Sequence, residues 1–326
     1  MWKTRITEMF GIKYPVILGA YGEFGTSAIA VPVSEAGGLG TITASALRTP
    51  EKLREDIRKA RELTDKPIAL TISVQMNPDV EGMLKVALEE KVPVIETGGF
   101  RADELGKRIK DAGIKWVHKV ASVKHAVAAE RQGVDAVHIL TLEGIGFKSV
   151  EQLPTLTTTT IAAKKLSIPL IVSGGIGDAR GLLGALAMGA DGVAIGTALM
   201  ATTECPVTER VKKHLLKLDE DDEKLRKRCL STPTPEEYAR VMKRRGKIAN
   251  NQWLRELSQV MLGESSDRVE EKPTFELEEE NVFRAGIYSL AAAVVDKIVT
   301  VDEFITKMMN EAEEIVKSNG IGWVPD

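Results

Sequence analysis

Eight short apolar runs recur between residues 16 and 195, and they constrain the fold more than any other feature of the sequence. Most of them are apolar throughout rather than alternating with polar residues, which is typical of strands buried on both faces in a parallel sheet. Segments with helical character separate them. The runs are Val16–Leu18, Leu39–Ile42, Ile68–Val74, Val92–Glu96, Trp116–Val120, Ala136–Leu140, Leu170–Ser173 and Gly192–Ile195.

The segments between the runs carry helix start and stop signals. Thr49-Pro50-Glu51 combines a capping threonine, a first-turn proline and an early acid. Asp178 is placed to cap the helix after the seventh run, and Gly189 to end it. Eight strand–helix units in this order predict a (β/α)8 barrel. The alternative, a doubly wound sheet, would normally carry G-x-G-x-x-G after its first strand. This motif is absent here, where the sequence reads Leu18-Gly19-Ala20-Tyr21-Gly22, so the barrel is favoured.

The sequence changes character after the eighth run. Residues 205–284 are rich in charged, helix-forming residues and show no buried strand pattern. We therefore expect a barrel at 1–204, a smaller helical subdomain at 205–284, and closing helices of the barrel at 285–326. The basic stretches Lys224–Arg228 and Lys243–Lys247 are interpreted as solvated helix faces, with a basic binding surface as the alternative.

The composition argues against several classes of protein. Lys and Arg total 44, Asp and Glu total 47, and aromatic residues make up 5%, so neither a basic footprint nor a stacking surface for nucleic acid is expected. Two cysteines, Cys205 and Cys229, do not make a disulfide framework, and with four histidines they do not suggest a metal site. The amino terminus lacks an apolar signal segment, and glycines interrupt the apolar stretch Leu182–Ala201, so a cytoplasmic protein without a membrane span is expected.

Two glycine loops follow the seventh and eighth runs, at Ser173–Asp178 and Ile195–Thr197. Glycines let a phosphate approach backbone N–H groups, and the start of a helix adds partial positive charge. In a (β/α)8 barrel the last two loops commonly form a phosphate site, which belongs to a cofactor or to a sugar-phosphate substrate. The alternative is that the glycines only permit tight turns. Neither loop has the G-x-x-x-x-G-K-[ST] form of a P-loop.

Several motifs, specific in combination, extend this interpretation over most of the chain. They are Thr4–Ile17, Val117–Val120, Ala129–Val137, Ser173–Gly175, Asp178–Gly181, Met188–Asp191, Ile195–Thr197 and Glu204–Pro206. Together they resemble the FMN-binding nitronate monooxygenases, once called 2-nitropropane dioxygenases. That family also includes NADH:quinone reductases and FMN-dependent enoyl-acyl-carrier-protein reductases.

The resemblance implies FMN, with its phosphate at the two glycine loops. It also implies that the backbone after the first strand lies near the flavin, and that Thr71 stands where the family usually has an asparagine. Lys119 matches a family lysine that reaches the cofactor, where a cation would stabilise negative charge on the reduced flavin; a surface ion pair is the alternative. The expected cofactor set is Gly19, Ala20, Tyr21, Thr71, Lys119, Gly146, Ser173, Gly174, Gly175, Gly196 and Thr197.

The chain departs from the family at its catalytic motif, roughly E-A-G-G-H-x-G, which here reads Glu143–Ser149. Phe147 occupies the histidine position, and phenylalanine cannot transfer a proton. The catalytic residue is therefore left unassigned, with His138, Glu143 and Tyr288 as weak candidates. His138 is interpreted first as a hydrogen-bonded interior residue.

Four functions remain open at this stage. The first is an FMN-dependent oxidoreductase that passes hydride from NAD(P)H to a quinone, an enoyl group or a similar small acceptor. The second is nitronate oxidation with oxygen, the third a flavin-binding protein without turnover, and the fourth a sugar-phosphate isomerase or lyase. A small-molecule substrate is expected for each enzyme, and homo-oligomerisation is left open.

Overall fold

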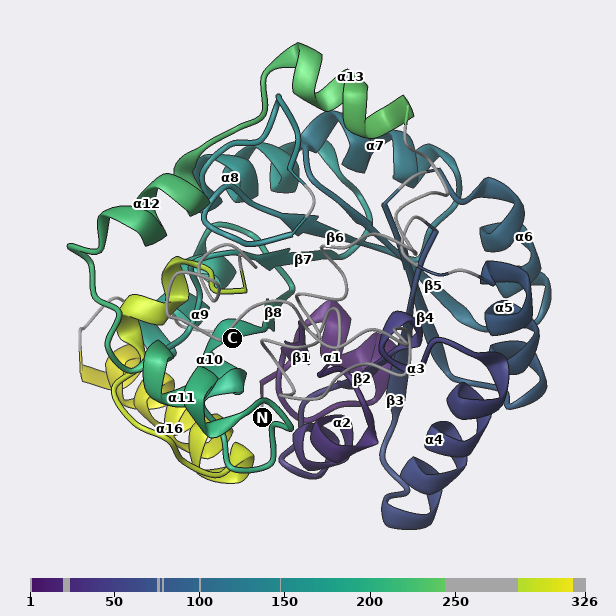
Figure 1. Ribbon diagram of the computed structural model, residues 1–326, viewed down its shortest axis with the longest axis horizontal. Helices are drawn as coiled ribbons and strands as arrows, with labels where there is room; N and C mark the ends of the chain where they lie inside the picture. The colour runs from purple at the N-terminus through teal and green to yellow at the C-terminus, as the bar shows by residue number, and fades with distance from the viewer. Residues whose placement is uncertain are drawn as a thin grey trace, which may run out of the picture.

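The computed structural model describes residues 2–19, 24–74, 77, 79–99, 101–146, 148–243 and 287–318. Its eight strands form one parallel sheet in the order β1-β8-β7-β6-β5-β4-β3-β2, and a bridge between Ile17 and Leu39 closes β1 onto β2. The strands are β1 (Val16–Leu18), β2 (Gly40–Thr43), β3 (Ile68–Ser73), β4 (Val94–Gly98), β5 (Lys115–Val120), β6 (Ala136–Leu140), β7 (Leu170–Ser173) and β8 (Gly192–Ile195). The predicted (β/α)8 barrel is confirmed (Figure 1).

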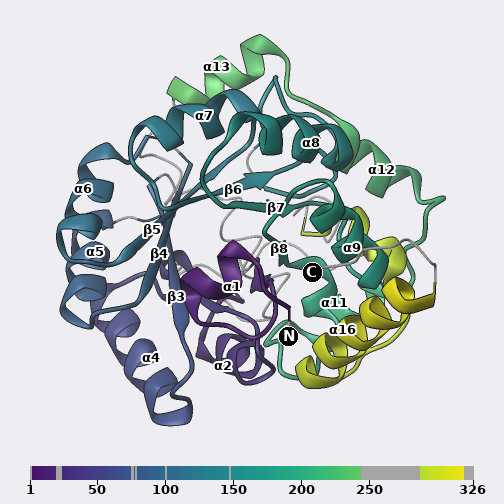
Figure 2. The same ribbon diagram turned by 180° about the vertical axis from the view of Figure 1, so that it is seen from behind.

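Helices surround the ring of strands, apart from the first helix, which lies within the ring in both views (Figures 1 and 2). They are α1 (Arg5–Phe10), α2 (Ser27–Glu35), α3 (Ala44–Leu47), α4 (Pro50–Leu63), α5 (Val80–Glu89), α6 (Asp103–Asp111), α7 (Val123–Arg131), α8 (Thr155–Lys165), α9 (Ala179–Ala187), α10 (Thr197–Met200), α11 (Glu209–Leu215), α12 (Glu223–Leu230), α13 (Pro235–Lys243), the 3-10 helix η2 (Leu290–Val294) and α16 (Val301–Ser318). The predicted caps are present, because Thr49 accepts from the amide of Lys52 and Asp178 from that of Gly181.

Four strands match the predicted runs at both ends, and β4 differs most. The apolar run predicts Val92–Glu96, whereas β4 spans Val94–Gly98. It starts after Pro93, which has no N–H to donate to a neighbouring strand. It continues through polar residues because Glu96 and Thr97 both find hydrogen-bond partners, which an apolar pattern does not foresee.

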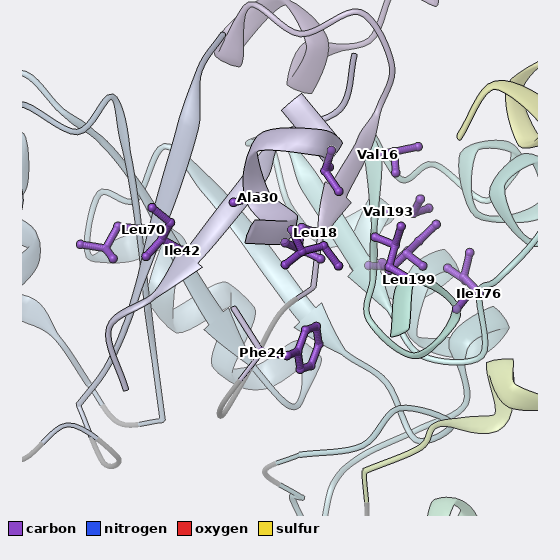
Figure 3. Close-up of a cluster of buried hydrophobic side chains, with 14 of the residues drawn as sticks. Val16, Leu18, Phe24, Ala30, Ile42, Leu70, Ile176, Val193 and Leu199 are labelled. Atoms are coloured by element: carbon purple, nitrogen blue, oxygen red, sulfur yellow. The ribbon is translucent and has the colours of Figure 1, made fainter. Parts of the chain in front are cut away.

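The side chains that face outward from the strands form the larger core, between sheet and helices. Figure 3 shows part of it, with Leu18, Ile42 and Val193 pointing away from the barrel interior toward the helical layer. These side chains are at most 1% exposed. Burial of each is worth about 1.5–3 kcal/mol, so this layer carries much of the stability of the fold.

The eighth helix of the barrel comes from a distant part of the chain. After β8 the chain forms only the short α10 and then runs through α11, α12 and α13. Helix α16 packs against both α9 and α2 and so closes the ring of helices (Figure 1). A bridge between Thr202 and Val299 brings the returning chain beside the end of α10. The predicted boundary at 284 lies outside the described residues.

A second, smaller core fills the barrel interior. We call it the apolar ring: one inward-facing residue from each strand or the bridge beside it, namely Ile17, Leu39, Ala69, Val94, Val117, Ala136, Ile171 and Ala194. Ile6, Phe10 and Ile12, in and just after α1, join the same cluster. Helix α1 lies inside the ring of strands in both views (Figures 1 and 2), so this end of the barrel is plugged.

No helix in the described ranges is both long and apolar enough to cross a membrane. Nor do those ranges bring together three or more His, Cys, Asp or Glu side chains that could hold a metal ion.

Candidate active site

The next inward-facing position after the apolar ring is polar or glycine on every strand. Because side chains of a strand alternate between its faces, the residue two positions after each member of the apolar ring also faces the interior. These residues form what we call the polar ring: Gly19, Thr41, Thr71, Glu96, Lys119, His138, Ser173 and Gly196. None of the eight is apolar apart from the two glycines. They lie toward the carboxyl ends of the strands, where active sites of this fold are found.

A hydrogen-bonded chain runs through the polar ring across β3, β4, β6 and β7. The Thr71 Oγ1 hydroxyl donates to Glu96 Oε1 at 3.2 Å. Glu96 Oε2 lies 2.6 Å from His138 Nδ1, and His138 Nε2 lies 2.8 Å from Ser173 Oγ. The predicted interior role of His138 is therefore observed, since its side chain is only 2% exposed and both ring nitrogens have partners.

The charges of this chain follow from its partners. Burial opposes ionisation of Glu96, but the His138 side chain, together with Lys119 and Thr71, lowers the pKa of Glu96 to about 2. Burial also lowers the pKa of His138. Glu96 is then a carboxylate, so the Nδ1–H of a neutral His138 donates to it, and Nε2 accepts from the Ser173 hydroxyl.

Lys119 is the cation of the polar ring. It is half-buried on β5, in register with Gly98 on one side and His138 on the other. Its charge lowers the pKa of both Glu96 and His138, which places it electrostatically beside the hydrogen-bonded chain. The positively charged side chain of Lys119 thus lies toward the carboxyl ends of the strands.

The two glycine loops come together at the ends of β7 and β8, next to the end of β1. A Cβ at Gly196 would lie 2.7 Å from the carbonyl oxygen of Gly19, so only glycine lets these strands approach so closely. Gly174 has φ 125°, and a Cβ there would lie 2.8 Å from the amide nitrogen of Gly144. The loops are therefore built around bare backbone.

Two observations show that these residues fit a phosphate-bearing cofactor. Within the described residues the amides of Gly175 and Gly196 donate to no acceptor, and α9 begins directly after the first of these loops. Such amides at a helix start are suited to a phosphate. The buried hydroxyls of Thr41 and Thr43, which share the inward face of β2, likewise have no partner in the described part of the chain. Buried polar groups without a hydrogen-bond partner destabilise the fold unless a ligand or a water molecule binds to them.

The loop after β6 is held against the β7 loop. The Glu143 carboxylate accepts from the amide of Thr155 at 2.8 Å and from its hydroxyl at 2.9 Å, so it caps the start of α8. Thr155 Oγ1 also lies 2.9 Å from the carbonyl oxygen of Gly174, which is the alternative acceptor for its single hydrogen. These bonds give Glu143 a structural role at the rim. Gly146 is exposed in the same loop, and the Leu140 side chain lies beneath it.

The closing segment reaches the site through Thr197 and Tyr288. The amide of Ser289 donates to Thr197 Oγ1 at 2.9 Å. Tyr288 is 3% exposed, and its hydroxyl donates to the backbone carbonyl of Val211 in α11 at 2.8 Å. That bond directs the hydroxyl toward the helical segment. Three predicted site residues, Ala20, Tyr21 and Phe147, lie outside the described residues.

The sequence analysis missed Glu96 and Thr41 as site residues. Glu96 ends a run that was interpreted only as a buried strand, although a carboxylate in such a run is itself unusual. Thr41 lies inside the second run and was passed over for the same reason. The available signal was a polar residue two positions after an inward-facing apolar one.

Comparisons with known proteins place these features in context. The sequence profile of a family described as nitronate monooxygenase matches residues 3–82 and 73–311. The chain is 33% identical over 214 residues to (3aS,4S,5R,7aS)-5-hydroxy-7a-methyl-1-oxo-octahydro-1H-indene-4-carboxyl-CoA dehydrogenase of Rhodococcus jostii, covering 66% of this chain and 60% of that enzyme. It is 29% identical over 266 residues to a probable nitronate monooxygenase of Staphylococcus aureus, covering 68% and 75% of the two chains.

The match therefore spans only about 60% of the length of the dehydrogenase relative. Among solved structures, FabK from Thermotoga maritima superposes with a TM-score of 0.78 at 28% identity, covering 97% of this chain and 98% of FabK. A nitroalkane oxidase from Streptomyces ansochromogenes, at 19% identity and a TM-score of 0.68, shares the fold.

Proposed function

The chain belongs to the nitronate monooxygenase family, and from that premise we propose that it is an FMN-dependent oxidoreductase that moves hydride from NAD(P)H to a small organic acceptor of the quinone or enoyl type. One observation carries the proposal. The polar ring holds a lysine and lies next to two glycine loops. In the described part of the chain the hydroxyls of Thr41 and Thr43 and the amides of Gly175 and Gly196 have no hydrogen-bond partner, and these features fit the ring and the phosphate of one ligand.

The backbone of the two loops would hold the phosphate of FMN. The amides of Gly175 and Gly196 supply donors, and the start of α9 adds partial positive charge. Gly174 and Thr197 complete this end of the site. When bound, FMN supplies a ring that takes hydride from a reduced nicotinamide and gives it to an acceptor.

The remaining residues would orient the flavin and tune its surroundings. Lys119 would place a positive charge near the flavin, where it would stabilise the negative charge that develops during hydride transfer. This would be the main electrostatic contribution of the protein to the reaction. Thr41 and Thr43 would offer their inward-facing hydroxyls to the polar edge of the flavin. Gly19 brings the backbone at the end of β1 close to the same space.

The choice of acceptor rests on Phe147. At the position where the family has its histidine, this side chain neither takes nor gives a proton, so a reaction that needs a base there is disfavoured. Hydride transfer through the flavin needs mainly positioning from the protein. The dehydrogenase name of the Rhodococcus relative adds support for exchange of hydride with a carbon skeleton.

The experiment is an anaerobic titration of the purified, FMN-loaded protein. We expect NADH or NADPH to bleach the visible flavin absorbance rapidly, and a quinone or an enoyl thioester to restore it. Binding of FMN without bleaching by either nucleotide would indicate a flavin carrier instead. A colourless protein that does not bind added FMN would contradict the proposal and favour a sugar-phosphate enzyme.

Nitronate oxidation with oxygen is the second candidate, because the matching family profile and the Staphylococcus relative both bear that name. Oxygen uptake with an alkyl nitronate separates the two reactions. In that case we expect Phe147→His to raise nitronate turnover, since it restores a proton acceptor at the family position.

A further inference from the structure

A carboxylate inside the barrel needs an explanation that packing does not provide. Glu96 projects into the interior from β4, and its side chain is 13% exposed. Replacing a buried ionic group by an apolar one of similar volume is often neutral or stabilising. The apolar ring directly below shows that this barrel packs well with apolar residues. Glu96 is therefore retained for something other than the stability of the fold.

The contacts of Glu96 lead to the phosphate loop. Its carboxylate receives the Nδ1–H of His138, which fixes the tautomer and leaves Nε2 to accept from Ser173. The carbonyl of Ser173 in turn accepts from the amide of Thr141 at 2.8 Å and from its hydroxyl at 2.9 Å. The Ser173 hydroxyl is thus held by His138 from inside the barrel and its carbonyl by Thr141 at the end of β6, so the first residue of the glycine loop is fixed in place.

The charge of Glu96 also has a partner. Lys119 faces the same interior from the neighbouring strand β5, two residues beyond Val117, which is the register partner of Glu96. From there its charge lowers the pKa of Glu96 and of His138. Opposite charges in a poorly hydrated interior interact strongly and cancel at a distance. A ligand above the polar ring therefore experiences Lys119 partly offset by Glu96, and not a bare positive charge.

We propose that Glu96 is a positioning residue of the cofactor site, which orients Ser173 through His138 and offsets the charge of Lys119 beneath the flavin. This inference rests on the proposed function, because it supposes that FMN binds above the polar ring. It assigns no proton transfer to His138, whose two nitrogens are both engaged.

The test compares the reduction potential of bound FMN and its dissociation constant in wild type and two charge variants. Glu96→Gln keeps the shape and an acceptor for His138 and removes the charge. Its amide NH2 then donates to the Thr71 hydroxyl, which donates to the carboxylate in the wild type. We expect its potential to rise, because Lys119 is no longer offset. Lys119→Met should lower the potential, and the double variant should return toward wild type.

A third variant separates charge from position. Glu96→Ala leaves His138 and Ser173 without their anchor, and we expect FMN to bind about tenfold more weakly. In Glu96→Gln the affinity should stay within about threefold of wild type, since the hydrogen bonds are kept. The potential is a readout that a purely structural role would not move in opposite directions for the two charge variants.

Thr97→Val is the matched control. Thr97 neighbours Glu96 on β4 but faces outward, where its hydroxyl accepts from Trp116 Nε1 at 2.8 Å and contacts His118 Nδ1 at 2.8 Å. It should lower stability without changing the potential. Equal potentials in wild type, Glu96→Gln and Lys119→Met, or an equal shift in Thr97→Val, would overturn the inference while leaving FMN binding intact.

Two further outcomes are informative. A wild-type protein that binds no FMN contradicts the proposed function itself, and is distinguished by the absence of flavin in every sample. If Glu96→Gln fails to fold, Lys119→Met tests the same charge pair from its other end without disturbing the buried hydrogen bonds, and an unchanged potential there overturns the inference.

Discussion

The apolar ring and the polar ring occupy the same eight strands and face the same interior, yet they serve different ends. They are separated by two residues along each strand, which is one repeat of the pleat. The apolar ring meets α1 and is closed to ligands. The polar ring holds a carboxylate, a lysine and the Thr41 hydroxyl, which has no partner among the described residues, and it lies next to the glycine loops. Stability and chemistry thus lie in adjacent rings, and either can be altered separately.

Their energetics differ accordingly. Burying an aliphatic or aromatic side chain stabilises by about 1.5–3 kcal/mol, and the apolar ring consists of such groups. Burying an unpaired hydroxyl destabilises by about 1–3 kcal/mol, and Thr41 and Thr43 both present one. The comparison predicts that damage to the apolar ring unfolds the protein, whereas damage to the polar ring changes ligand affinity.

The largest effect is expected from Phe10→Ala, which empties the plug of the apolar ring. Phe10 is 6% exposed on α1. Truncating a buried phenylalanine lowers the free energy of unfolding by about 3–5 kcal/mol, which urea unfolding of the apoprotein measures. The FMN affinity of the folded protein should stay within about twofold, because distant sites are independent.

Leu63→Ala is the control for that measurement, since Leu63 is 58% exposed on α4 and its loss should change the unfolding free energy by less than about 0.5 kcal/mol. A large loss of FMN affinity in folded Phe10→Ala would show that the two rings are not separable.

A fall in pH should affect the two rings differently, because the polar ring contains ionisable groups and the apolar ring contains none. The pKa of Glu96 is lowered to about 2 in the fold from its ordinary 4.5. The unfolded chain therefore binds the proton first, and stability is lost as pH falls from about 4.5 to 2, by about 3 kcal/mol. Unfolding at a series of pH values should show a steeper slope in wild type than in Glu96→Gln, whose remaining slope comes from Glu90, Glu130 and Glu303, carboxylates whose pKa values are also lowered by hydrogen bonds or ion pairs.

His118 supplies a second window that must be kept apart. Burial lowers the pKa of this outward-facing histidine to about 4 from its ordinary 6.5, so its contribution is lost as pH falls from about 6.5 to 4. His118→Asn should reduce the slope in that upper window, where His138 also contributes because burial lowers its pKa, and leave the lower one. Loss of the lower slope in His118→Asn, with no change in Glu96→Gln, would reverse the assignment.

A smaller effect is expected where the strands approach most closely. A Cβ at Gly196 would lie 2.7 Å from the carbonyl oxygen of Gly19, so Gly196→Ala must shift backbone at the glycine loops. We expect FMN to bind at least about tenfold more weakly, which is about 1.4 kcal/mol. Fluorescence titration of the apoprotein measures it.

Gly184→Ala is the matched change, because nothing lies within 4 Å of a Cβ at Gly184 in α9. Alanine there should raise stability by up to about 1 kcal/mol and leave FMN affinity unchanged. Equal affinities in both variants would mean that the close approach at Gly196 has no part in the cofactor site.

The fold was readable from the sequence because strands buried on both faces appear as unbroken apolar runs. The glycine loops were readable too, since they follow the last two runs directly. The eighth helix was harder to assign, because α16 is separated from β8 by more than a hundred residues, α11 to α13 among them. Its helical pattern was visible, but its place between α9 and α2 is a tertiary fact.

The polar ring was only partly readable, for a physical reason. Lys119, His138 and Ser173 were noticed from a family resemblance or as chemically distinctive residues, whereas Glu96 and Thr41 stood inside runs that satisfy the apolar pattern. To know that these two residues face inward, one must know which residues of each strand point into the barrel. Only the closed barrel shows this. The roles of all these residues toward a cofactor remain predictions, and Phe147, Ala20 and Tyr21 also lie outside the described residues.

The smallest expected effect concerns Thr41, and it separates the two rings most sharply. Its hydroxyl is buried and has no partner within the described residues, so the fold gains nothing from it. Thr41→Val should therefore raise the stability of the apoprotein by about 1 kcal/mol, a few degrees at most in melting temperature. The same change should weaken FMN binding a few-fold, because the hydroxyl no longer meets the ligand.

Thr41→Ser is the control. It keeps the hydroxyl, so its affinity for FMN and the stabilisation of the protein by FMN should both stay as in the wild type. If valine lowered apoprotein stability as Thr97→Val is expected to, the hydroxyl of Thr41 would belong to the fold, and the polar ring would not be reserved for a ligand.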